Sequence, residues 1–425
     1  MSKTKHLFSP LKKILTRYAQ LNTATKYMFA AQFTLQGVHV AMFILLNYYM
    51  VKQGFKDYET VEIWAYRFAA VMVLAFPIGL YIKGRSVKPF FWAAVIIMPV
   101  ASVSLIYSIS VGWYWMMYGS AILWGVAYAC MQTCVQPFIL LNTKKELHSE
   151  AFSLSFLSFS SMIFIEGIIY FVLSSQFPTV VNEYSFLMAI GFLSVIGIYF
   201  VSKIDLEENY SERIPLRRIV YDYDWGLIFK AIIPTVLMAV GAGFSIPVIN
   251  LFFLNIHGVE STSFSLMGSM TYLMVACVML FIPYIRRRFG YQVAVTLFQT
   301  AAVISLFIMS ITEYFSDWEY ALGLAIFFYL IRQPLMNCAS PMASEVVVYY
   351  VGKRNQEIIA ALNASIWNGS WLFSTAIFAF LRKMEFRYVS IFLITVVLYV
   401  ISIIWYWWLI REYERRESAQ LDLEL

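Results

Sequence analysis

Four ionisable side chains lie well inside long apolar stretches of the chain: His39, Arg67, Glu166 and Arg332. A charge at bilayer depth is costly, so such a group normally faces a protein interior or a wet cavity. An arginine there presents a planar fork of donors to a carboxylate or a phosphate. A buried carboxyl group or a histidine can take up and release a proton. These residue types therefore indicate anion recognition and proton transfer.

The composition indicates the elements that must hold these side chains. Of the 425 residues, 61% are hydrophobic and 13% are charged, whereas about 25% are charged in soluble globular domains. A helix that crosses a bilayer needs about 20 mostly apolar residues. The sequence therefore predicts an all-α polytopic membrane protein. The chain contains twelve apolar runs, at 27–51, 62–82, 89–110, 113–136, 150–174, 185–203, 227–254, 264–285, 293–312, 319–345, 357–381 and 388–410.

The basic residues predict the orientation of these spans. If the N-terminus is cytoplasmic, 23 of the 31 Lys and Arg residues fall on inner segments and five on outer loops. Because cytoplasmic loops carry the excess of positive charge, we expect both termini in the cytoplasm. We expect a plasma membrane, here a bacterial inner membrane. The tail 1–26 is predicted to form a short interfacial helix, or else a disordered basic tail. The net charge of +6 needs no nucleic acid partner.

The second half of the chain repeats the first. At an offset of 204 residues the fourth span aligns with the tenth without a gap, and Cys134 meets Cys338. At an offset of 203, Asn47 in LLNYYM meets Asn250 in VINLFF. The repeat predicts two pseudo-symmetric six-helix halves. The predicted organisation is an N-terminal tail 1–26, a half 27–202, a cytoplasmic linker 203–226, a half 227–410 and a cytoplasmic tail 411–425.

Topology, repeat and partial motifs together resemble the major facilitator superfamily, with twelve helices in two six-helix halves. The loop after the second span, GLYIKGRSVK, and its counterpart PYIRRRFGYQ keep much of a loop motif of that family but lack its acidic residue. GAGFSIPVINLFF, the tenth span and IWNGSW are similar to a poorly characterised bacterial branch. The residues that match the loop motif are Gly79, Lys83, Gly84, Arg85, Arg288 and Gly290.

The resemblance implies a substrate path lined by the first, fourth, seventh and tenth spans. It places Arg332 and His39 in this path, as groups that bind substrate or gate it. The alternative for Arg332 is that it holds helix carbonyls or Asn337. For the amides and the tryptophan, the alternative is ordinary helix bridging and packing. The further candidates for substrate binding or gating are Asn337, Asn47, Asn250, Asn368 and Trp367.

Glu166 is the candidate for proton coupling, with Arg67 at a similar predicted depth in the outer half of the membrane. Burial makes a carboxyl group easier to protonate, whereas a nearby guanidinium opposes that. A permanent Arg67–Glu166 ion pair is the structural alternative. His39 is a second titratable candidate, and a helix-packing histidine is the alternative for it.

Enzyme and cofactor signatures are absent from the sequence. It contains no Walker loop, Rossmann glycine fingerprint or HEXXH motif. Cys130 and Cys134 share a helix face, but no His or carboxylate joins them at metal-ligand spacing. We therefore predict no enzyme, no cofactor and no metal site. The fourth span lacks the intramembrane Arg, and the fifth lacks the Gly-Pro motif, of drug–proton antiporters, which disfavours a multidrug function.

The prediction from sequence is a monomeric secondary active transporter. It would move a small organic solute by alternating access, with protons as the coupling ion and the lipid bilayer as its surroundings. The balance of charges favours an anionic or amphipathic substrate. One alternative is an efflux pump or flippase for hydrophobic drugs or lipids, consistent with the aromatic content. The second is a non-transporting membrane sensor or scaffold.

Overall fold

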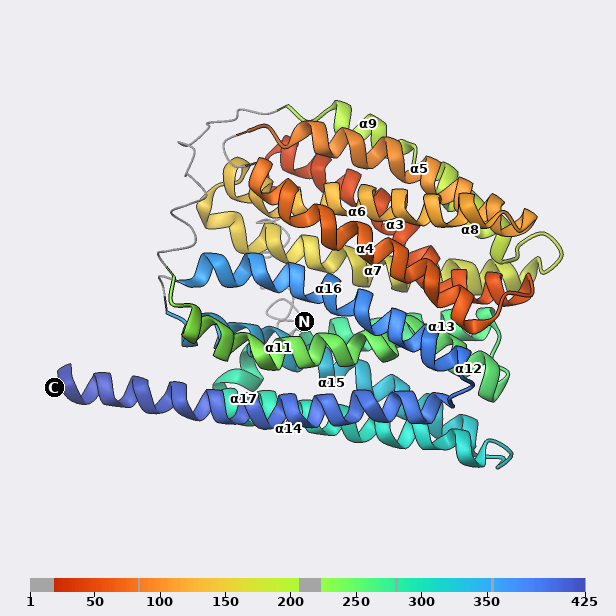
Figure 1. The fold of residues 1–425 in the computed structure, drawn as a ribbon. Helices are drawn as coiled ribbons and strands as arrows, with labels where there is room; N and C mark the ends of the chain where they lie inside the picture. The colour runs from red at the N-terminus through yellow and green to blue at the C-terminus, as the bar shows by residue number, and fades with distance from the viewer. Residues whose placement is uncertain (1–18, 83–84, 206–222, 280–281, 353–354, 425) are drawn as a thin grey trace, which may run out of the picture.

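The chain folds into a long bundle of helices arranged as two side-by-side groups (Figure 1). The computed structural model describes residues 19–82, 85–205, 223–279, 282–352 and 355–424, and these contain no strand. The first group comprises α3 (Thr23–Lys52), α4 (Asp57–Tyr81), α5 (Lys88–Val111), α6 (Tyr114–Asn142), α7 (His148–Gln176), α8 (Glu183–Leu193) and α9 (Ile196–Ser202). The second comprises α11 (Trp225–Ser245), α12 (Ile249–His257), α13 (Ser261–Met279), α14 (Ile282–Ile311), α15 (Ala321–Tyr350), α16 (Gln356–Lys383) and α17 (Tyr388–Glu424).

The helices match the apolar runs of the sequence. Within the described residues, eleven helical segments are long and apolar enough to cross a membrane. Helix α16 covers the remaining run, 357–381, but Asn363 and Asn368 lower its hydropathy. The predicted fold class, an all-α polytopic membrane protein, is confirmed. The predicted interfacial helix within 1–26 falls largely outside the described residues, as does most of the linker 203–226.

Some helices are interrupted or extended where the sequence predicts single spans. The seventh run is broken by one 3₁₀ turn, η2 (Ile246–Val248), between α11 and α12. Pro247 lies in this turn, and proline cannot donate a backbone hydrogen bond. The sixth run is interrupted between α8 and α9. Helix α17 continues to Glu424, through the segment predicted as a tail.

Close contact between α4 and α6 depends on a glycine. A Cβ atom at Gly125 would overlap the carbonyl oxygen of Arg67 and lie 2.7 Å from the Ala70 Cβ. Both neighbours are fixed parts of α4, so neither can move aside cheaply. Gly125 therefore sets the spacing that brings Arg67 of α4 against the aromatic rings of α6.

We predict that Gly125→Ala destabilises the protein by about 1–3 kcal/mol, the usual cost of overpacking a core. The measurement is the thermal unfolding midpoint of the purified protein in detergent. Gly119→Ala is the matched control, because Gly119 lies on the same helix with nothing within 4 Å of an added Cβ. The control should retain or raise the midpoint, since alanine is the better helix former. Equal midpoints for the two variants would contradict the packing argument.

Candidate functional site

A cavity of about 470 Å³ lies between the two groups of helices. We call the end of the bundle where α3 begins and α17 ends the terminus side, and the opposite end the far side (Figure 1). Gln136 and Ser340, on the terminus-side parts of α6 and α15, line the cavity and are exposed. The cavity therefore opens towards the terminus side. Its other lining residues are Gln36, His39, Phe43, Arg67, Phe68, Tyr128, Gln132, Val135, Ser155, Phe159, Ser160, Ile246, Tyr272, Met279, Gln333, Met336, Asn337, Trp367, Asn368 and Trp371.

Arg67 is the single charged side chain among the described residues that line this cavity. It is 2% exposed, and its guanidinium carbon lies 4.1 Å from the Tyr128 ring centroid and 4.6 Å from that of Phe68. Its Nε and Nη2 atoms have no hydrogen-bond partner. Ring faces attract a cation, but they do not replace hydrogen-bond acceptors. The site therefore holds a buried positive charge with unused donors.

His39 lies beside Arg67 in an aromatic cluster. Its ring centroid is 4.7 Å from that of Tyr128 and 5.9 Å from that of Phe159, and its Nδ1 has no hydrogen-bond partner. Both His39 and Arg67 thus line the cavity from the first half of the chain. The structure brings these two predicted residues together.

Three further predicted residues line the same cavity from the second half. Asn337 donates from Nδ2 to the Gln333 carbonyl oxygen at 2.9 Å, within α15. Trp367 lies one helical turn from Trp371 on α16, with ring centroids 6.3 Å apart. Asn368 also lines the cavity. Asn337, Trp367 and Asn368 therefore bring polar and aromatic groups of the second half to the cavity that His39 and Arg67 line.

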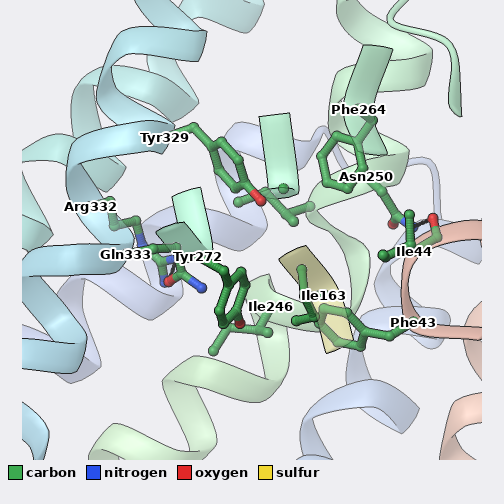
Figure 2. A pocket seen from close by; sticks show the side chains of 12 residues that line it. Phe43, Ile44, Ile163, Ile246, Asn250, Phe264, Tyr272, Tyr329, Arg332 and Gln333 are labelled. Carbon is green, nitrogen blue, oxygen red and sulfur yellow. Dashed lines mark hydrogen bonds between the residues drawn. The ribbon is translucent and has the colours of Figure 1, made fainter. Parts of the chain in front are cut away.

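Arg332 lies in a separate, smaller pocket of about 20 Å³ (Figure 2). It is 1% exposed and donates to Gln333 Oε1 at 3.1 Å and to Ser245 Oγ at 3.3 Å. Four residues line both the pocket and the larger cavity and so form the wall between them: Phe43, Ile246, Tyr272 and Gln333. This volume suffices for about one water molecule. Its Nε atom has no hydrogen-bond partner, and most of the other residues that line the pocket are apolar. Arg332 therefore occupies a tight, largely apolar niche at the end of α11.

Glu166 is not among the described residues that line the cavity. Its Oε1 lies 2.9 Å from where a Cβ at Gly37 of α3 would stand, which places the carboxyl group between α3 and α7. Glu166 is 3% exposed, and neither of its carboxyl oxygens has a hydrogen-bond partner. Arg67 stacks on rings instead, so within the described residues these two side chains form no ion pair. The static pair considered from the sequence is not what the structure contains.

Two repeat-related asparagines clasp the halves together. Asn47 donates from Nδ2 to Asn250 Oδ1 at 2.7 Å and to the Pro247 carbonyl oxygen at 2.8 Å. Asn250 reciprocates with a longer bond of 3.4 Å to the Ile44 carbonyl oxygen. Ile44 and Pro247 are themselves 203 residues apart, as the two asparagines are. The contact is therefore symmetric, which places the pseudo-two-fold axis between these amides. We name it the asparagine clasp.

The clasp provides a prediction about coupling between the halves. Asn47→Ala and Asn250→Ala should each lower the unfolding midpoint, and the double variant should lose less than the sum. Side-chain hydrogen bonds within membranes contribute about 0.6 kcal/mol on average, so we expect a coupling energy of about 1 kcal/mol. Asn142→Ala is the control partner, because its amide bonds within its own helix. If the loss of stability in the double variant equals the sum of the losses in Asn47→Ala and Asn250→Ala, the clasp is contradicted.

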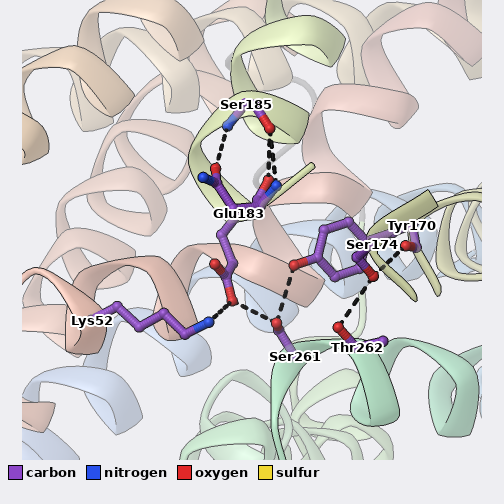
Figure 3. Close-up of polar contacts among 8 residues, drawn as sticks. Lys52, Tyr170, Ser174, Glu183, Ser185, Ser261 and Thr262 are labelled. Atoms are coloured by element: carbon purple, nitrogen blue, oxygen red, sulfur yellow. Dashed lines mark hydrogen bonds and ion pairs between the residues drawn. The ribbon is translucent and has the colours of Figure 1, made fainter. Parts of the chain in front are cut away.

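A second group of polar contacts joins the halves on the far side (Figure 3). Glu183, at the start of α8, forms an ion pair with Lys52 Nζ at 2.6 Å and accepts a hydrogen bond from Ser261 Oγ at 2.5 Å. Ser261 also lies 3.1 Å from the Tyr170 hydroxyl. Ser261 belongs to the second half of the chain, and the other three to the first. These bonds therefore hold α13 against α3, α7 and α8.

A third contact is centred on Asp57 at the start of α4. Its carboxylate accepts hydrogen bonds from Asn255 at 2.9 Å, from Arg382 Nη2 at 2.7 Å and from the Tyr388 hydroxyl at 2.5 Å. All three donors belong to the second half. Among the described residues, the hydrogen bonds between the halves lie near the middle of the bundle or on its far side. The far side is thus closed where the terminus side is open. We name this contact the Asp57 latch.

The predicted loop motif is only partly described. Lys83 and Gly84 lie outside the described residues. Arg85 is exposed, 4.0 Å from the Tyr81 ring centroid, and Arg288 is also exposed. Gly290 has φ 69°, a left-handed conformation that favours glycine, and forms the kink inside α14. Gly79 lies on α4, where an added Cβ atom would be 3.7 Å from the Thr133 methyl group.

Several residues of the cavity and of its closed end were not predicted from the sequence. Gln132 and Gln136 stand four residues apart within an apolar run, which is a visible signal of a polar helix face. Asp57, Glu183 and Arg382 stand at span ends, where charges are common, so nothing in the sequence distinguished them. Their partners are more than 75 residues away along the chain.

Comparison with known proteins identifies the fold. No family model and no curated protein sequence matches the chain. A POT family transporter in complex with a thioalcohol-conjugated peptide superposes with a TM-score of 0.69 and 13% identity, over 92% of this chain and 96% of that chain. An inward-facing bacterial homologue of the iron transporter ferroportin gives 0.70 and 9%, over 90% and 97%. A bacterial homologue of ferroportin in an outward-facing state gives 0.61 and 11%, over 92% and 99%.

These similarities confirm the predicted resemblance at the level of the fold. The chain has the major facilitator fold of membrane transporters, over nearly its whole length. Its arrangement matches the inward-facing homologue better than the outward-facing one. This agrees with a cavity that opens on one side and a far side that is closed by the clasp and the latch.

Proposed function

We propose that this protein is a secondary active transporter that moves a small organic anion across a membrane by alternating access. One observation carries the proposal: a cavity between the two halves has Arg67 as the single charged group among its described lining residues, and exposed Gln136 and Ser340 mark its mouth on the terminus side. A volume of about 470 Å³ falls in the usual range of about 300–1,000 Å³ for small-molecule sites. The two halves, 27–202 and 227–410, would rock about the site.

Arg67 would provide the anion-binding group in this mechanism. Buried polar groups are normally hydrogen-bonded, and a buried charge normally has a partner. A carboxylate offers two acceptor oxygens in the plane of the guanidinium fork. The Nε and Nη2 atoms of Arg67 are buried without an acceptor of their own, and a carboxylate would supply one once the surrounding rings make room for it. His39, Asn337, Asn368 and Trp367 would contact the remainder of the substrate.

Alternating access requires the far side to open in turn. The asparagine clasp and the Asp57 latch would then separate, and the terminus-side mouth would close. The small pocket borders both the cavity and Asn250 of the clasp, and we propose that Arg332 acts in gating there. Glu166 is the carboxyl group we propose for proton coupling, because it is buried without a fixed partner. Its position against α3 would link its protonation to the helix that carries the clasp.

The proposed setting follows from charge and fold. The terminus side would face the cytoplasm of a bacterial inner membrane, in line with the distribution of Lys and Arg. We propose a monomer without catalytic activity. Efflux of hydrophobic compounds is the second candidate function, because rings and the methionines Met279 and Met336 make up much of the cavity wall.

The test is a thermal-shift screen of the purified protein, followed by uptake into proteoliposomes. The panel comprises organic acids, phosphate esters, peptides, nucleosides and lipophilic cations. Stabilisation by acids, and uptake of the hit that depends on an imposed pH gradient, would support the proposal. Stabilisation by lipophilic cations or neutral hydrophobic compounds alone would favour the efflux function. Binding without any transport would favour a sensor.

A further inference from the structure

The walls of the cavity narrow the substrate class. We propose that the substrate is a monocarboxylate that carries an aromatic ring, an inference that rests on the proposed function. The carboxylate would pair with Arg67, and the ring would lie against the aromatic side chains contributed by both halves. Three features of the cavity support this class: the number of its charges, the composition of its walls and the position of its polar groups.

The first feature is the number of charged side chains in the cavity. Arg67 is the single charged side chain among the described residues that line the cavity. One guanidinium can neutralise one carboxylate, and a second negative charge on the ligand would meet rings or neutral amides. Desolvating an unpaired charge is costly. A monoanion is therefore favoured over a phosphate ester or a dicarboxylate, and a cation is disfavoured by Arg67 itself.

The second feature is the aromatic composition of the cavity walls. Ring contacts run continuously from one half of the chain to the other. Phe159 of α7 lies edge-on to Tyr272 of α13, with centroids 5.9 Å apart, and Phe68 of α4 lies edge-on to Trp371 of α16 at 5.3 Å. Aromatic groups prefer edge-to-face or offset partners, which a flat ligand ring can supply. The aromatic residues that line the cavity are His39, Phe43, Phe68, Tyr128, Phe159, Tyr272, Trp367 and Trp371.

The third feature is the position of the polar groups in the cavity wall. Gln136 and Ser340 lie at the mouth, on α6 and α15, whereas the deeper polar groups of the wall include Gln333 and Tyr272, which border the small pocket. Arg67 instead lies among the rings, held by Tyr128 and Phe68. A carboxylate that reaches Arg67 must therefore bring its attached atoms into the ring-lined part. An apolar ring next to the carboxylate fits that environment, and a polyhydroxylated chain does not.

The experiment compares three probes of similar size: 3-phenylpropionate, its neutral amide 3-phenylpropionamide and the aliphatic acid hexanoate. Affinities are measured by thermal shift and by calorimetric titration on the full-length protein. We expect 3-phenylpropionate to bind about tenfold more tightly than each of the other two, since ring pairs and charged hydrogen bonds each contribute on that scale. Phe159→Leu should reduce the preference over hexanoate. Arg67→Gln should remove the preference over the amide.

The outcomes separate this inference from the proposed function. If hexanoate binds as tightly as 3-phenylpropionate and both depend on Arg67, the aromatic requirement is wrong and the anion transporter stands. If the amide binds as tightly as the acid, both proposals are wrong. If none of the three probes binds, the aromatic inference is wrong, and the broader panel tests the transporter. Arg411→Gln is the control, because Arg411 stacks on Trp407 outside the cavity and should leave all affinities unchanged.

Discussion

Replacing Arg67 with glutamine is expected to lower the affinity for organic anions by about 10- to 100-fold. Hydrogen bonds to charged groups contribute about 1.5–3 kcal/mol, and each 1.4 kcal/mol is about a factor of ten in affinity. Glutamine keeps part of the side-chain volume against Tyr128 and Phe68 but removes the charge and the planar fork. The measurement is calorimetric titration of the best acid from the screen, together with its uptake into proteoliposomes.

The same variant should be at least as stable as the wild type without ligand. A buried charge without hydrogen-bond partners is unfavourable in the empty site, and Arg67 has two such nitrogens. The empty Arg67→Gln protein should therefore unfold at the same temperature as the wild type or higher, while its stabilisation by acids disappears. Arg67→Lys keeps the charge without the fork and should fall between the two. A variant that binds acids normally would show that Arg67 is structural.

Removing the Asp57 carboxylate is expected to shift the protein towards a state open on the far side. Asp57→Ala loses the hydrogen bonds from Asn255, Arg382 and Tyr388 at once. The Asp57–Arg382 ion pair is partly exposed, so its own contribution is modest. We expect the state closed on the far side to lose about 1.4 kcal/mol of stability relative to the open state. This loss raises the open-to-closed ratio about tenfold. The fold should survive, because each half keeps its own core.

The measurement uses a reporter cysteine. Val61 is fully buried near the far end of α4, so Val61→Cys in a background without the native cysteines should be labelled only when the far side opens. Its labelling by a membrane-impermeant maleimide should rise about tenfold with Asp57→Ala, matching the shift in population. Arg382→Ala should act in the same direction. Asp317→Asn is the control, an exposed acid on the same side, and unchanged labelling in both latch variants would refute the latch.

The hydropathy of the sequence was sufficient to predict the helices, because a bilayer admits few structures other than helices of this length. The repeat at 203 residues aligned Asn47 with Asn250, but equivalence in sequence does not state distance. Contact follows only because both residues lie on the pseudo-two-fold axis. The break at Ile246–Val248 was signalled by Pro247, although the sequence alone predicted one continuous span.

The rotation of each helix is what the sequence could not provide. Depth follows from counting residues, but one residue turns a side chain by about 100° around the helix axis. Glu166 faces α3, whereas a Cβ on the adjacent Gly167 would meet Ser265 of the other half. Arg67 and Arg332 are likewise both buried, and only packing places Arg67 in the larger cavity. The proton-coupling role of Glu166 and the anchoring role of Arg332 stay predictions.

The asparagine clasp has a consequence for how the two halves can vary. Two identical half-length chains that met through it would form an isologous dimer interface, in which each copy contributes the same patch. Any substitution would then appear twice. In this single chain the two copies of the patch differ, since Trp64 donates to Asn47 Oδ1 at 2.9 Å and the backbone N–H of Leu251 donates to Asn250 Oδ1. A single chain that carries both patches thus allows one asparagine to be substituted without the other. The balance between the state open on the terminus side and the state open on the far side can then change in single steps.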